Sequence, residues 1–142
     1  MKTLLSLLFL LSISGIASAA DTKPVVNRDG NCTLSVPSEW SVESTMGMAF
    51  SPDKKVSAVV SSPKHGMATM AEVEETAPTI YKDDKVTKKS ASEFEMEGTS
   101  GNGKPNFYRA VPAGAKICIA EVQYESGTPA DAKAIIETLK AK

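Results

Sequence analysis

Histidine is almost missing from this 142-residue sequence, in which His65 is the only one. A serine or cysteine nucleophile needs a neighbouring base to activate it, and His65 is the only imidazole available. We expect residues 63–66, which read Pro-Lys-His-Gly, to be an exposed loop, and no Gly-x-Ser-x-Gly motif is present. The sequence therefore favours a protein that is not an enzyme. A hydrolase whose site leaves no motif is the remaining enzymatic interpretation.

Clusters of one charge are also missing. The chain has 16 basic and 17 acidic side chains, and Lys88-Lys89 is only a pair. Binding to a phosphate backbone needs clustered lysine and arginine, so the sequence argues against nucleic acid as a partner.

Beyond its first residues the sequence has no long apolar run. It opens with Lys2, an apolar run from Leu4 to Ile16 and small residues at 17–19. This pattern predicts a signal peptide over residues 1–19, with cleavage after Ala20 as the alternative. The run is shorter than a membrane-spanning helix, and no cysteine follows it directly, which argues against a lipid anchor. We therefore predict a periplasmic or secreted protein without a membrane span once the signal is removed.

Cysteine occurs only at Cys32 and Cys118. An even pair in an oxidising compartment predicts a disulfide. Cys32 alternates with polar residues on the same strand face as Leu34 and Val36, and Cys118 shares a face with Val122, so both sulfurs should point to a buried side. A bond needs Cα atoms about 4.4–6.8 Å apart. The alternative is two separate buried thiols.

Hydropathy alternation organises the rest of the chain. Residues 20–31 are polar, and we expect a flexible leader followed by a single domain over residues 32–142. Thr69 and Glu72 predict a capping box at the start of a helix that Pro78 should kink or end. Residues 117–124 are apolar on both faces at their start, which predicts a central strand. The sequence predicts strands near 32–36, 46–50, 56–61, 86–87, 94–97, 107–111 and 117–124, and helices from Thr69 and Pro129.

The expected fold class is therefore α+β: a mainly antiparallel, twisted sheet of about six to seven strands, with an internal helix and a C-terminal helix packed on it. The chain resembles the PsbP-like family, which includes photosystem II extrinsic proteins, Mog-type Ran-binding proteins and DcrB-like periplasmic proteins. The resemblance implies a non-enzymatic domain that docks on other proteins. It rests on Val36-Pro37 with Trp40, on Phe50-Ser51-Pro52-Asp53, on the Phe94, Gly98 and Phe107 hairpin, and on residues 134–139.

Gly98 to Lys104 matches the first seven positions of a phosphate-binding P-loop. The eighth position, which should be serine or threonine, is Pro105, and a strand rather than a helix should follow. A hairpin loop with Asn102-Gly103 is the alternative that these two departures favour.

Methionine provides the one unusual cluster. His65, Met67 and Met70 lie close in sequence, and Met46 and Met48 lie on an earlier strand. Thioether and imidazole ligands suit Cu(I). Core packing is the alternative that strand alternation and helical spacing favour. Trp40 and Tyr124 are candidates for lining a ligand groove, with core packing again as the alternative.

The sequence as a whole predicts an exported, non-enzymatic domain without a cofactor that binds or supports an envelope protein. The alternative is a small-molecule or Cu(I)-binding periplasmic module that uses His65, Met67 and Met70.

Overall fold

The computed structural model describes residues 21–125 and 129–142. The signal peptide and cleavage site predicted at residues 1–19 lie outside these ranges. No helix within them combines the length and the apolar composition that crossing a membrane requires.

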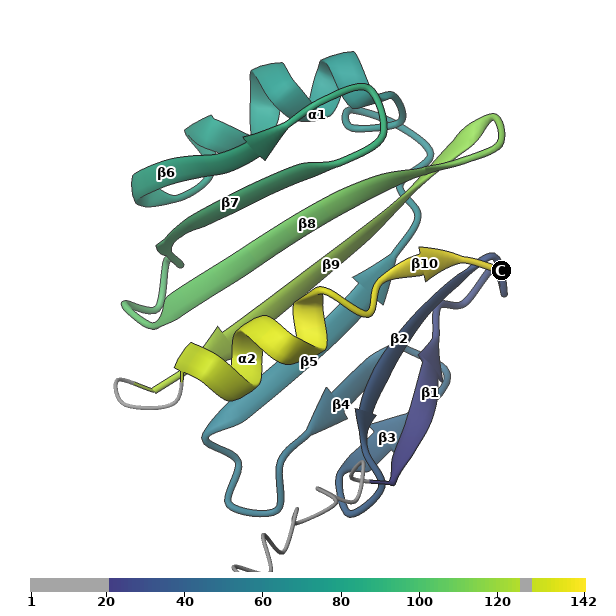
Figure 1. Cartoon of the computed structure of the whole chain (residues 1–142), viewed down its shortest axis with the longest axis vertical. Helices are drawn as coiled ribbons and strands as arrows, with labels where there is room; N and C mark the ends of the chain where they lie inside the picture. Colours follow the sequence, from purple (N-terminus) through teal and green to yellow (C-terminus); the bar gives the residue numbers. More distant parts are fainter. Residues whose placement is uncertain (1–20, 126–128) are drawn as a thin grey trace, which may run out of the picture.

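Two antiparallel sheets and three short helical segments make up the structure (Figure 1). This confirms the predicted α+β class. The helical segments are α1 (Met70–Thr76), the 3-10 turn η1 (Ala77–Thr79) and α2 (Pro129–Ile136). The smaller sheet has the order β1 (Thr22–Val26), β2 (Cys32–Pro37), β10 (Lys140–Ala141). The larger sheet has the order β3 (Ser41–Glu43), β4 (Met48–Phe50), β5 (Val56–Ser61), β9 (Lys116–Tyr124), β8 (Pro105–Ala113), β7 (Phe94–Thr99), β6 (Lys82–Lys89).

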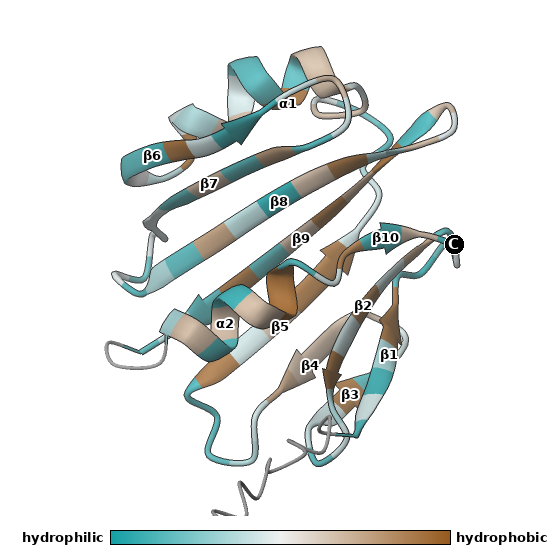
Figure 2. Ribbon diagram, in the orientation of Figure 1, coloured by the Kyte–Doolittle hydropathy of each residue, from teal (hydrophilic) through white to brown (hydrophobic). Residues whose placement is uncertain are grey.

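Strand β9 lies at the centre of the larger sheet, between β5 and β8. Its residues from Ile117 to Ala120 are all buried, although successive side chains point to opposite faces. Both faces are therefore covered at this end of the strand, as the apolar pattern predicted. Figure 2 shows the corresponding brown segment in β9.

Each face of the larger sheet is covered over a different half. The smaller sheet and α2 cover one face over β4, β5, β9 and part of β8, where Ala58, Ala120 and Val122 belong to one buried cluster. Helix α1 covers the other face over β7, β8 and β9, where Met96, Tyr108 and Ile119 belong to a second cluster. Because the two covers lie on opposite faces and over different sets of strands, part of each sheet face remains accessible.

Helix α1 begins and ends where the sequence predicted. The Thr69 hydroxyl accepts a hydrogen bond from the backbone N–H of Glu72, and the Glu72 carboxylate accepts one from the N–H of Thr69, which completes the capping box. The helix ends at Thr76, and Pro78 lies in the 3-10 turn that follows.

The predicted leader at residues 20–31 is wrong over part of its length. Thr22–Val26 forms strand β1, which pairs along its whole length with β2. Val25 is fully buried and lies opposite Leu34 in this pairing. Burial of this side chain and the paired backbone order a segment whose polar composition, with Pro24 at its centre, gives no alternating signal.

Candidate functional site

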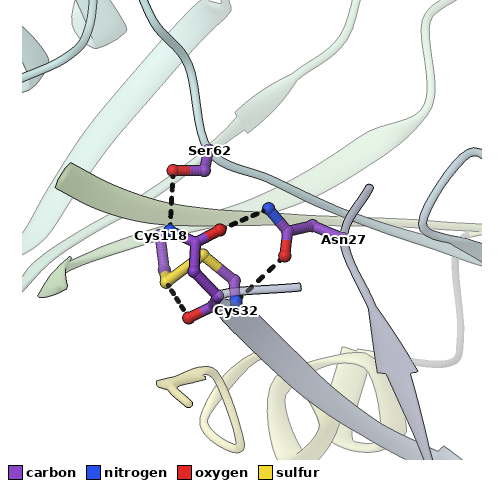
Figure 3. The surroundings of a disulfide bond; sticks show 5 residues. Asn27, Cys32, Ser62 and Cys118 are labelled. Atoms are coloured by element: carbon purple, nitrogen blue, oxygen red, sulfur yellow. Dashed lines mark hydrogen bonds between the residues drawn. A yellow bond between two sulfur atoms is a disulfide. The ribbon is translucent and has the colours of Figure 1, made fainter. Parts of the chain in front are cut away.

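The disulfide is present as predicted. It joins Cys32 on β2 to Cys118 on β9, with Cα atoms 5.5 Å apart, and both residues are fully buried (Figure 3). The bond therefore fastens the smaller sheet to the central strand of the larger one. Reagents in solution do not reach either sulfur in the folded protein, so its role is structural rather than catalytic.

A set of side-chain amides surrounds the disulfide (Figure 3). The Asn27 side-chain oxygen accepts a hydrogen bond of 2.9 Å from the Cys32 N–H. The Asn27 side-chain nitrogen donates one of 2.8 Å to the side-chain oxygen of Asn31. Asn31 in turn donates to the Ser62 hydroxyl at 3.1 Å. These bonds hold the turn between β1 and β2 against the end of β5. Burial of Asn27 could not be predicted from the sequence, because a polar residue in a polar segment carries no signal of burial.

The His65, Met67 and Met70 cluster is divided by the structure. His65 lies exposed in its loop, as predicted. Met67 and Met70 are partly buried and pack against the second core cluster, and the Tyr108 hydroxyl donates to the Met67 sulfur at 3.6 Å. These contacts favour core packing over a metal site.

Met48 begins β4, but Met46 lies in the turn between β3 and β4, so the predicted strand near 46–50 is two residues shorter than expected. Met46 is 62% exposed beside Arg28 and Lys64, and Met48 borders a small hollow with Val59 and Gln123. Among the described residues, no group of three or more histidine, cysteine or acidic side chains is placed to hold a metal ion.

The segment that resembles a P-loop is a hairpin loop between β7 and β8. Gly103 has a φ of +79°, the Ser100 hydroxyl donates to the carbonyl of Lys104 at 3.0 Å, and the Asn102 side chain accepts from the N–H of Lys104 at 3.1 Å. The loop enters a strand, so no helix N-terminus faces it. The hairpin interpretation is confirmed.

A buried polar cluster lies beneath α1 and η1. Asn106 is 1% exposed, and neither polar atom of its side chain has a hydrogen-bond partner among the described residues. The Tyr81 hydroxyl is also buried and unpaired, and it faces Asn106 and the carboxylate of Glu121. Burial and the Glu121 charge raise the pKa of both Tyr81 and Tyr108, so both hydroxyls stay neutral. Such groups are typical partners of an internal water.

The more apolar of the two large hollows lies between β2, the start of β5 and α2. We call it the Trp40 groove. Its volume is about 360 Å³. Trp40 is almost buried in the first core cluster and also borders this groove. Tyr124 does not border it and instead stacks on Phe107, with ring centroids 5.2 Å apart. The lining residues are Thr22, Ser35, Pro37, Glu39, Trp40, Val56, Asp131, Ala134, Ile135 and Thr138.

A larger hollow of about 620 Å³ lies beside the disulfide. It is polar, and exposed Arg28 and Lys64 share it with Asp29. Charges of both signs in an open hollow select no single class of ligand.

Comparison with known proteins shows which known fold this chain resembles. No family model matches the chain, and no curated protein matches its sequence. A solved structure is similar: the solution structure of cyanobacterial PsbP (CyanoP) from Synechocystis sp. PCC 6803, at a TM-score of 0.50 and 9% identity, over 93% of this chain and 99% of that chain. The fold is PsbP-like. At this identity the similarity shows the PsbP-like fold alone, which is the part of the predicted resemblance that is confirmed.

Two segments that carried the resemblance have defined places in the PsbP-like fold. Val36-Pro37 ends β2. The N–H of Trp40 donates to the Pro37 carbonyl at 3.1 Å, and this turn places Trp40 at the groove. In the turn after β4, the Ser51 hydroxyl donates to the Asp53 carboxylate at 2.7 Å. This bond lowers the pKa of Asp53.

Proposed function

We propose that this protein is an exported, non-enzymatic accessory domain that binds another protein at the cell envelope. The observation that carries the proposal is the buried disulfide between Cys32 and Cys118. Structural disulfides of this kind form and persist in oxidising compartments outside the cytoplasm. The PsbP-like fold supports an accessory role, because the resemblance drawn from the sequence implies a domain that docks on other proteins.

Two further observations support a binding role over catalysis. The single histidine is exposed, and among the described residues no hydrogen bond joins it to a serine or threonine hydroxyl. Tyr81 and Tyr108, whose pKa values are raised by burial and by Glu121, are neutral and lie inside the second core, and neither borders the two large hollows. General acid–base catalysis instead needs a titratable group with a suitable pKa within reach of a substrate.

The test begins with compartment and partner together. The full chain with a C-terminal tag is produced in its source organism, and the envelope fraction is purified after chemical crosslinking. We expect a mature chain that begins at Ala20 or Asp21, and one co-purifying protein that excess untagged domain displaces. Recovery of the intact chain in the cytoplasm with two free thiols would contradict export. Absence of any displaceable protein would contradict the binding role.

A further inference from the structure

We propose that the Trp40 groove is the docking site for the partner, and that it receives an apolar side chain flanked by basic residues from an extended peptide segment. This inference rests on the proposed function, since it takes the partner to be a protein.

The floor of the groove is apolar. Trp40, Val56 and Ile135 form it, and all three are almost fully buried within the first core cluster. Ala134 faces the groove from the exposed side of α2, and its small side chain leaves the entrance open. The volume of about 360 Å³ is at the lower end of the range for ligand sites, so it fits one or two side chains rather than a folded domain.

The rim of the groove has one sign of charge. Glu39, in the turn before Trp40, and Asp131, in the first turn of α2, are both exposed there. None of the described lining residues is basic. Complementary charges steer association and select among partners, so an apolar side chain with lysine or arginine beside it fits this groove better than one with acidic neighbours.

Insertion of a side chain fits the local backbone better than addition of a strand. Strand β1 is the edge of the smaller sheet next to the groove, and Pro24 is at its centre. Proline has no backbone N–H, so a continuous ladder with an added strand cannot form there. Specificity must then come from the groove itself.

The protein contains its own reporter for this groove, because Trp40 is its only tryptophan. Purified protein is titrated with three blocked pentapeptides that lack aromatic residues: Gly-Leu-Lys-Lys-Gly, Gly-Leu-Glu-Glu-Gly and Gly-Ser-Lys-Lys-Gly. We expect a saturable change in tryptophan emission with the first peptide. Replacing leucine with serine should weaken binding at least tenfold, since the apolar burial is lost. Replacing the lysines should weaken it at least threefold at low salt.

Variants then assign the binding to the groove. Glu39→Gln with Asp131→Asn should weaken the lysine peptide about threefold to tenfold and remove its preference over the acidic peptide. Ala134→Arg should abolish binding by filling the entrance and adding a positive charge. Glu137→Gln is the matched control, because Glu137 is exposed just after α2 and does not border the groove. Circular dichroism verifies that each variant is folded.

The outcomes separate this inference from the proposed function. Equal binding of the three peptides, or unchanged emission with all of them at millimolar concentration, overturns the docking site. If the envelope partner is captured equally well by wild type and by folded Ala134→Arg, the proposed function stands and the groove assignment fails. Peptide selectivity without any envelope partner retains the site's chemistry and contradicts the function.

Discussion

Gly47 and Val60 are in backbone contact where the β3–β4 turn meets β5. The N–H of Val60 donates to the carbonyl of Gly47 at 2.8 Å, and a Cβ at residue 47 would lie 2.6 Å from the carbonyl oxygen of Val60. The same Cβ would lie 3.2 Å from the Cα of Asn27 at the end of β1. Gly47 therefore allows the two sheets to approach each other beside the disulfide.

Gly47→Ala should lower the free energy of unfolding by about 3 kcal/mol. The φ of +64° disfavours any side chain at this position, and the added methyl group also displaces backbone. Gly103→Ala is the matched control, because Gly103 has a similar φ of +79° and no atom within 4 Å of an added Cβ. It should cost about 1 kcal/mol. Urea denaturation measures both, and equal losses would show that the close contact contributes nothing.

Replacing both cysteines, as Cys32→Ala with Cys118→Ala, should lower the free energy of unfolding by about 4 kcal/mol. The bond joins positions 86 residues apart, so it restricts the unfolded chain strongly. Chemical denaturation at neutral pH measures the loss. Thiol counting in denaturant provides the control on the native protein, where the expected result is no free thiol. Two free thiols in material from its own compartment would refute the bond.

Tyr81→Phe should leave stability at neutral pH unchanged or raise it by up to about 1 kcal/mol, because it removes a buried, unpaired hydroxyl. Above about pH 10, near the ordinary pKa of tyrosine, the free energy of unfolding should depend on pH. Burial and Glu121 raise the pKa of Tyr81, so the folded protein keeps a proton that the unfolded chain releases, and stability falls as pH rises.

In Tyr81→Phe this alkaline fall should be shallower by up to about 1.4 kcal/mol per pH unit. Tyr124→Phe is the comparison, since Tyr124 is partly exposed and should change the slope less. Urea midpoints between pH 9 and 11.5 measure the slopes. Identical slopes in wild type and Tyr81→Phe would contradict the raised pKa.

Cu(I) binding should not depend on Met67 and Met70. Both side chains pack against the second core, and the Met67 sulfur already accepts a hydrogen bond from Tyr108. Met67→Leu with Met70→Leu keeps the packing volume and removes the sulfurs. Competition with a chromogenic Cu(I) chelator should give the same result for this variant and wild type. A tight, stoichiometric site that the substitutions abolish would establish the metal-binding alternative.

Local periodicity made much of the fold predictable. The alternation around Cys32 and Cys118 placed both sulfurs on buried faces, and Thr69 with Glu72 placed the start of α1. The hairpin at residues 98–105 followed from its glycines and Pro105. In each case the signal lies within a few residues of the structure that it describes.

Features that depend on distant segments were not predictable. Strand β10 has only two residues, and its pairing with β2 depends on where α2 ends. Burial of Asn27 and Asn106 depends on which half of each sheet face is covered. Trp40 was a candidate for a groove, but the acidic rim arises only because the fold brings Asp131 to Glu39.

Strand β2 lies between β1 and β10, and the Thr138 side chain, just before β10, accepts a hydrogen bond of 2.8 Å from the N–H of Ser35. A polypeptide emerging from the ribosome therefore cannot complete the smaller sheet until residues 140 and 141 are free. The free edge of β2 stays open until then. Completion of the smaller sheet is a non-local folding step, because Ser35 and Thr138 lie 103 positions apart in the sequence.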